Sequence, residues 1–135
     1  MFTLWFDRAS EIVLARFTGV FTTEDFVGYE AAMIHFLGTQ GERGTNHVRT
    51  LCDFSDIEAV AVPESRMAEQ GSHPPVVRQL RVVVAPPFAG DDFGHCYIEQ
   101  QRTVHGTEPV IVASLEEAYV LLGLENPQFE AVEHS

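Results

Sequence analysis

Apolar residues in this chain form short runs and helical spacings, and polar or glycine-rich residues separate them. The runs at residues 81–85 and 109–113 are typical of short buried strands, and each precedes a segment with the spacing of an amphipathic helix. After the second run, Ser114 and Glu117 have the spacing of a capping box, which marks the first turn of a helix that Gly123 ends. This alternation of strands and helices predicts an α/β domain with a largely parallel sheet.

The first forty residues predict a hairpin followed by a helix. Residues 2–6 and 12–18 are rich in β-forming residues, a short polar segment joins them, and Gly19 is expected to end the second strand. The stretch Thr-Thr-Glu-Asp at residues 22–25 supplies an N-cap hydroxyl and acids that favour the start of a helix, which Gly38 is expected to terminate. Helical spacing predicts that the buried face of this helix consists of Phe26, Tyr29, Met33, Phe36 and Leu37.

The middle of the chain predicts a third strand at residues 47–54, after a surface loop at residues 38–47. Asp53 and Ser55 then lie at the carboxyl end of this strand. Pro63 follows and fits the first turn of a short helix, because its missing N–H has no helical partner there.

The last part of the chain predicts one more helix and a tail. The helix carries Phe93, Cys96 and Tyr97 on its inward face. A single domain is expected over residues 1–124. The acidic stretch at residues 125–135 is expected to form a C-terminal tail that frays, with docking of its one aromatic residue, Phe129, as the alternative.

Composition narrows the class of protein. The chain has 135 residues and a formal net charge of −12. It contains no lysine, and all eight Lys or Arg residues are arginine. A field of this sign repels phosphate backbones and anionic lipid headgroups, so neither nucleic acid nor a membrane surface is an expected partner. No apolar stretch approaches the roughly 20 residues of a membrane span, and the short apolar start does not read as a signal peptide. Cys52 and Cys96 predict reduced thiols in the cytoplasm.

Four parts of the chain carry a resemblance to a known family. They are the strand and helix cap at residues 13–19 and 22–25, the apolar strand with Asp-x-Ser at residues 51–55, the strand at residues 81–85, and the capped helix at residues 114–123. In these parts the chain resembles the SpoIIAA-like superfamily, the small bacterial domains grouped as STAS-like or CRAL-TRIO-related. The resemblance implies a single α/β domain with a mixed, mostly parallel sheet, a β-hairpin entry, successive βα units and helices largely on one side.

One departure from the family concerns its regulatory serine. In the anti-sigma-factor antagonists of this superfamily, an Asp-Ser pair followed by Gly begins the helix after the Asp-x-Ser strand, and that Ser is phosphorylated. Here Pro63, Glu64, Ser65 and Arg66 occupy the corresponding stretch. Ser65 is therefore the candidate phosphorylation site, although the pattern around it differs.

Acidic and aromatic side chains supply the candidate ligand contacts. Asp53 and Ser55 are placed where open α/β sheets bind ligands, although Asp and Ser also cap turns through nearby backbone N–H groups. Asp91 and Asp92 form an acidic pair that fits either a magnesium ion or the dipole at a helix start. The six histidines are dispersed, and no catalytic or nucleotide-binding motif is present, so no catalytic residue, metal site or cofactor is predicted.

Three hypotheses for function follow from these observations. The first is a regulatory or interaction module without catalysis, which binds a protein partner and forms a homodimer through an exposed edge of its apolar first strand. The second is a carrier of a small apolar or amphipathic ligand in a cavity between helices and sheet, near Phe88 and Phe93, for which ordinary core packing is the alternative. The aromatic residues that could line this cavity are Phe26, Tyr29, Phe36, Phe88, Phe93 and Tyr97. The third is an enzyme that uses Asp53 with Asp91 or Asp92.

Overall fold

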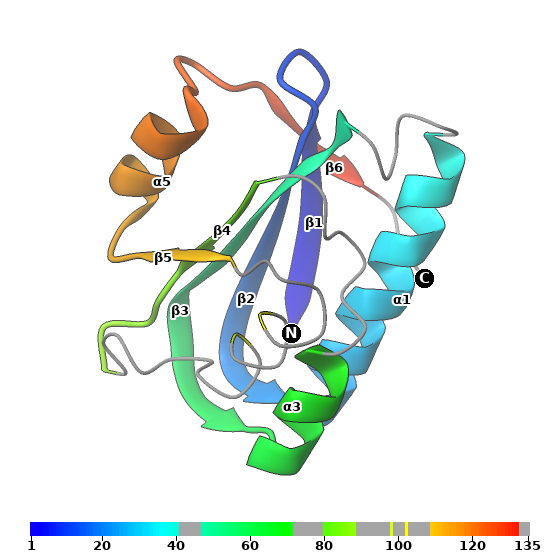
Figure 1. Cartoon of the computed structure of the whole chain (residues 1–135), viewed down its shortest axis with the longest axis vertical. Coiled ribbons are helices and arrows are strands. Elements are labelled where there is room, and N and C mark those ends of the chain that lie inside the picture. Colours follow the sequence, from blue (N-terminus) through cyan, green and yellow to red (C-terminus); the bar gives the residue numbers. More distant parts are fainter. Residues whose placement is uncertain (41–46, 72–79, 89–97, 99–101, 103–108, 133–135) are drawn as a thin grey trace.

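The fold of the chain is built on one mixed sheet, seen in a computed structural model that describes residues 1–40, 47–71, 80–88, 98, 102 and 109–132 (Figure 1). Its strands are ordered β5-β4-β3-β2-β1-β6 across the sheet. The pairs from β2 to β5 are parallel, and β1 is antiparallel to both β2 and β6. The strands are β1 (Phe2–Asp7), β2 (Ile12–Thr22), β3 (Arg49–Ala61), β4 (Arg81–Val84), β5 (Val110–Val112) and β6 (Phe129–Val132), and the helices are α1 (Thr23–Thr39), α3 (Glu64–Gly71) and α5 (Leu115–Leu122).

The two faces of the sheet carry separate apolar clusters, because successive strand residues point to opposite sides. Val13, Ala15 and Phe17 of β2 pack on one face with the buried side of α1 and with Met67 of α3. Leu14 of β2 and its neighbours on the other face pack with α5. Most of the described helical residues therefore cover one face, and the predicted α/β class with hairpin entry, mostly parallel sheet and βα units is confirmed.

Helix α1 begins as predicted but ends later. Thr22 is its N-cap: the Thr22 hydroxyl accepts from the amide of Asp25 at 3.2 Å, and the Asp25 carboxylate accepts from the amide of Thr22 at 3.1 Å. This reciprocal pair completes a capping box. The expected stop at Gly38 is wrong, because the helix continues to Thr39 and Gln40 is the C-cap.

Strand β2 continues past Gly19, so the predicted end at this glycine is wrong. Gly19 adopts φ +69°, and the register with β3 shifts directly after it, which makes it part of a bulge. The apolar residues Val20 and Phe21 then resume the pairing.

Strand β3 also continues past its predicted end at Phe54 and reaches Ala61. The polar residues Asp53 and Ser55 resemble a strand end in the sequence, but local hydrogen bonds satisfy them inside the strand. Ile57 then restores apolar packing on the face that α1 covers. Asp53 and Ser55 therefore lie in the middle of β3 and not at its carboxyl end.

The C-terminal segment corrects two expectations. Residues 129–132 do not fray: they form β6, which pairs antiparallel with residues 4–7 of β1. Asp7 holds the approach to β6, since its carboxylate accepts a hydrogen bond from the amide of Gln128 at 3.2 Å. β1 consequently lies between β2 and β6, and the exposed β1 edge that suggested self-association does not exist.

The last βα unit matches its prediction closely. The Ser114 hydroxyl accepts from the amide of Glu117, and Gly123 at φ +71° caps the end of α5. The Glu117 carboxylate accepts from the amide of Ala113 rather than from that of Ser114. The proposed helix with Phe93, Cys96 and Tyr97, the Asp91–Asp92 pair and most of the predicted loop at residues 38–47 lie outside the described residues.

We expect alanine at two glycines to change stability in opposite directions. Gly19→Ala destabilises by about 1 kcal/mol, because an L-residue is strained at φ +69° even though a new Cβ meets no atom within 4 Å. Gly38→Ala stabilises by about 0.5–1 kcal/mol, because the position is helical and equally open. Urea unfolding measures both values, and a stabilised Gly19→Ala variant would contradict the bulge.

Candidate functional site

Asp53 is the centre of a structural network inside β3. Its side chain is 1% exposed, and its Oδ1 accepts from the Ser55 amide at 2.9 Å and from the Ser55 hydroxyl at 2.6 Å. Its Oδ2 lies 3.4 Å from Nε of Arg16 on β2, and the same guanidinium contacts Asp56 at 3.1 Å. The Arg16–Asp53 pairing immediately precedes a register shift, so Asp53 satisfies a backbone amide that the irregular ladder leaves available.

The carboxylate of Asp53 is buried, and its two oxygens differ in their contacts. Oδ1 accepts both hydrogen bonds from Ser55, whereas Oδ2 has no hydrogen-bond partner and faces the Arg16 guanidinium in an ion pair at 3.4 Å. The structural alternative given for Asp53 and Ser55 in the sequence is therefore the one that the geometry supports. Within the described residues, no three His, Cys, Asp or Glu side chains lie in an arrangement that could hold a metal ion.

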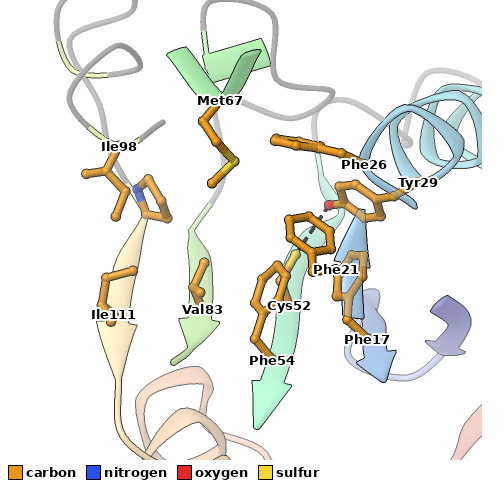
Figure 2. A pocket seen from close by; sticks show the side chains of 11 residues that line it. Phe17, Phe21, Phe26, Tyr29, Cys52, Phe54, Met67, Val83, Ile98 and Ile111 are labelled. Atoms are coloured by element: carbon orange, nitrogen blue, oxygen red, sulfur yellow. Dashed lines mark hydrogen bonds between the residues drawn. The ribbon is translucent and has the colours of Figure 1, made fainter. Parts of the chain in front are cut away.

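A cavity of about 70 Å³ lies on the opposite face of the sheet, under α1 and α3 (Figure 2). Aromatic rings from β2, α1 and β3 form one wall of the cavity, and they belong to Phe17, Phe21, Phe26, Tyr29 and Phe54. The rest of the described lining is Cys52, Met67, Val83, Ile98, Pro109 and Ile111. No charged side chain is among these lining residues.

The aromatic wall is a contiguous set of ring contacts. The rings of Phe17 and Phe54 stack with centroids 4.4 Å apart and an interplanar angle of 2°. Phe21 meets the Phe54 ring edge-on at 5.1 Å, and Tyr29 meets the Phe17 ring at 5.4 Å. Such pairs hold one another in place, so the wall is formed before any ligand enters.

The polar atoms at the cavity wall contact each other. The Tyr29 hydroxyl and the Cys52 sulfur are 3.3 Å apart, as the dashed line in Figure 2 marks. Burial raises the pKa of Cys52 to about 11, so the thiol stays protonated at neutral pH. A buried, protonated thiol of this kind is a poor nucleophile.

Glu30 is a buried carboxyl on the same side of α1. It follows Tyr29 directly, lies one turn beyond Phe26 and is 7% exposed. Its Oε1 has no hydrogen-bond partner in the structure, and burial raises its pKa to about 8. The side chain is therefore mostly neutral at pH 7.

The predicted site residues do not gather around one pocket. Asp53 and Ser55 are on the face opposite the cavity, Phe88 is 57% exposed and does not line it, and Phe93 and Tyr97 lie outside the described residues. Ser65 is exposed in the first turn of α3, and its phosphorylation stays a prediction.

Sequence reasoning named Phe26 and Tyr29 among the aromatic residues that could line a cavity, but it missed the rest of the described lining. Phe17, Phe54 and Val83 were assigned only to strands, and nothing in the sequence distinguishes a core ring from a cavity ring. The usable signal was strand alternation, which places Cys52 and Phe54 on one face of β3 and Asp53 on the other.

The sheet order, the antiparallel entry and the helix placement define a SpoIIAA-like α/β fold. The particular solved structure that shows it is that of the anti-sigma factor antagonist SpoIIAA in its unphosphorylated form. It matches with a TM-score of 0.55 and 16% sequence identity, over 91% of this chain and 98% of that chain. The resemblance stated from the sequence is thereby confirmed at the level of the fold. No family model and no curated protein matches the chain. Among the described helices, none is both long and apolar enough to cross a membrane.

We expect substitutions of Asp53 to reveal a structural role. Asp53→Ala destabilises by about 2–3 kcal/mol, because it leaves the Ser55 amide without its acceptor and removes the buried partner of Arg16. The matched control Asp56→Ala costs less than about 0.5 kcal/mol, because Asp56 is exposed. Chemical unfolding compares the two. Equal stability of both variants, or a gain for Asp53→Ala, would instead indicate a residue kept for function.

We expect Glu30 to make stability depend on pH. Its carboxyl has a higher pKa in the folded state, about 8, than its ordinary value of 4.5, so its contribution is complete below pH 4.5 and is lost as the pH rises to 8. Relative to Glu30→Gln, the natural protein should lose on the order of several kcal/mol across this window and nothing further above it. Unfolding at a series of pH values measures the difference, with the exposed Glu24→Gln as control. A flat difference would contradict the burial of an ionisable Glu30.

Proposed function

We propose that the protein is a non-catalytic, STAS-like module that binds a protein partner in the cytoplasm. Its fold is that of a protein named as an anti-sigma factor antagonist, which supports a regulatory role. The carboxylate of Asp53, its best catalytic candidate, accepts hydrogen bonds from Ser55 and forms an ion pair with Arg16. Both features favour recognition over reaction.

The proposal rests mainly on one observation: the β2–β3 pair projects beyond the end of β4. β4 pairs with β3 only as far as Asp53, whereas β2 and β3 continue together to Thr22 and Ala61. Figure 1 shows this pair curving beyond β4 beside α3. Val20 and Val60, on this end, are 44% and 38% exposed.

Acidic side chains accompany the two valines. Asp56 and Glu58 are exposed on the same stretch of β3. Val60 pairs with Phe21, the residue after Val20, so the two valines point to opposite sides of the projecting pair. We call these four residues, which cover both of its sides, the sheet-end surface. Apolar contacts rimmed by charge are typical of binding surfaces. With a net charge of −12, the chain is complementary to a basic partner. A second copy would bring the same acids to this surface, so like charges oppose a homodimer here.

The sheet-end surface is tested by capture with matched variants. The full chain is immobilised, proteins retained from an extract of its own cells are identified, and the affinity of each is then measured with purified protein. Val20→Lys and Val60→Lys should each lower the affinity for the true partner about tenfold or more, because each removes an apolar contact and adds a charge that repels a basic surface.

The control for this capture is Val120→Lys on α5, where the valine is 83% exposed and lies 60 residues along the chain from Val60. It should leave the affinity within about twofold, and higher salt should weaken binding. If every retained protein binds the natural chain and the two surface variants equally, the sheet-end surface is not the binding site.

A second function, carriage of a small apolar ligand, is supported by the aromatic cavity. Ligand sites for larger molecules usually have volumes of about 300–1,000 Å³. The volume of this cavity, about 70 Å³, is far smaller, which disfavours a lipid acyl chain and leaves only a small molecule for this function.

A further inference from the structure

We propose that the cavity under α1 and α3 is a binding site for a neutral molecule of about one aromatic ring. This inference deepens the carrier function proposed above and does not depend on the sheet-end surface. It rests on the volume of the cavity, on its lining and on its place in the fold.

The volume sets the size of the ligand. A space of 70 Å³ holds several water molecules, since each needs roughly 10–15 Å³ of such space. Several waters together have about the bulk of one small ring. Two fused rings or a long alkyl chain exceed it.

The lining sets the chemistry of the ligand. The wall of Phe17, Phe21 and Phe54 presents ring faces and edges, and Val83 and Ile111 of β4 and β5 close the opposite side (Figure 2). A ligand ring can add edge-to-face contacts to this wall. Because no charged side chain lines the described cavity, a charged ligand would lose its hydration without gaining an ionic partner.

The cavity lies where two helices meet the sheet. Met67 belongs to α3, Phe26 and Tyr29 belong to α1, and the strands β2 to β5 supply the rest of the wall that belongs to named elements. The sheet holds Phe17 and Phe54 in a fixed stack, and the helices need not collapse onto them. Rigid apolar cavities of this kind stay dry and accept apolar guests.

The test uses three probes with the full chain: toluene for a neutral ring, benzoate for a charged ring, and decanoate for an acyl chain. Methyl NMR follows the signals of Val83, Ile111 and Met67 during each titration. Toluene should shift these signals saturably, whereas Val82, on the opposite face, should hardly respond. Benzoate and decanoate should bind at least about tenfold more weakly.

Matched variants then locate the site. Val83→Leu adds one methylene inside the cavity and should lower the affinity for toluene about tenfold or more. Val112→Leu adds the same group at a half-buried position on the opposite face and should leave the affinity within about twofold. Both are mild changes, and the NMR spectrum itself reports whether each variant is folded.

The outcomes separate this inference from the functions proposed above. Decanoate binding at these methyls without toluene binding would overturn the ring-sized ligand and keep a carrier. Absence of saturable binding by all three probes would overturn both the ring-sized ligand and the carrier function. The partner capture would then still test whether the protein is an interaction module. Toluene binding that Val83→Leu leaves unchanged would place the ligand elsewhere and overturn the proposed site.

Discussion

The parallel pairing of β2 with β3 determines where the important side chains of this protein lie. These are its longest strands, and they pair from Ile12 and Arg49 to Thr22 and Ala61. The pairing brings Arg16 beside Asp53 on one face and stacks the rings of Phe17 and Phe54 on the other. Two register irregularities let the pair continue past polar residues and past Gly19. A shift of one residue would exchange the two faces and lose both contacts.

The two faces of this pair serve different purposes. On the face that α5 covers, ionic and polar groups bond to one another and hold the bulge. On the face that α1 covers, rings enclose an apolar cavity whose polar atoms, Tyr29 Oη and Cys52 Sγ, contact each other. Among the described residues, Asp53 bonds to Ser55 and Arg16 and the Cys52 thiol is protonated, whereas the projecting strand ends present apolar and acidic side chains to solvent. This distribution supports the partner recognition proposed above.

Local sequence signals predicted the elements well where short-range hydrogen bonds decide them. Thr22 and Ser114 mark helix starts because their hydroxyls bond to amides three residues later, and Gly123 ends a helix because it tolerates positive φ. The same local reasoning failed at Gly19, Asp53 and Ser55, where residues typical of strand ends form bulges inside long strands. Strand β6 was missed because its pairing with β1 joins residues that are far apart in the chain. The candidate site was only partly predictable, since a cavity depends on how rings from three elements fit together.

The most direct test of this account is hydrogen–deuterium exchange along residues 49–61 of the natural protein. If β3 pairs with β2 as far as Ala61, slowly exchanging amides should continue at alternate positions beyond Ser55. Asp53 would then be a mid-strand residue with a structural role, and Val60 would be held in place on the projecting surface. If protection instead stops at Phe54 and residues 56–61 exchange like a loop, Asp53 lies at a strand end. That result would contradict both the structural role of Asp53 and the sheet-end surface.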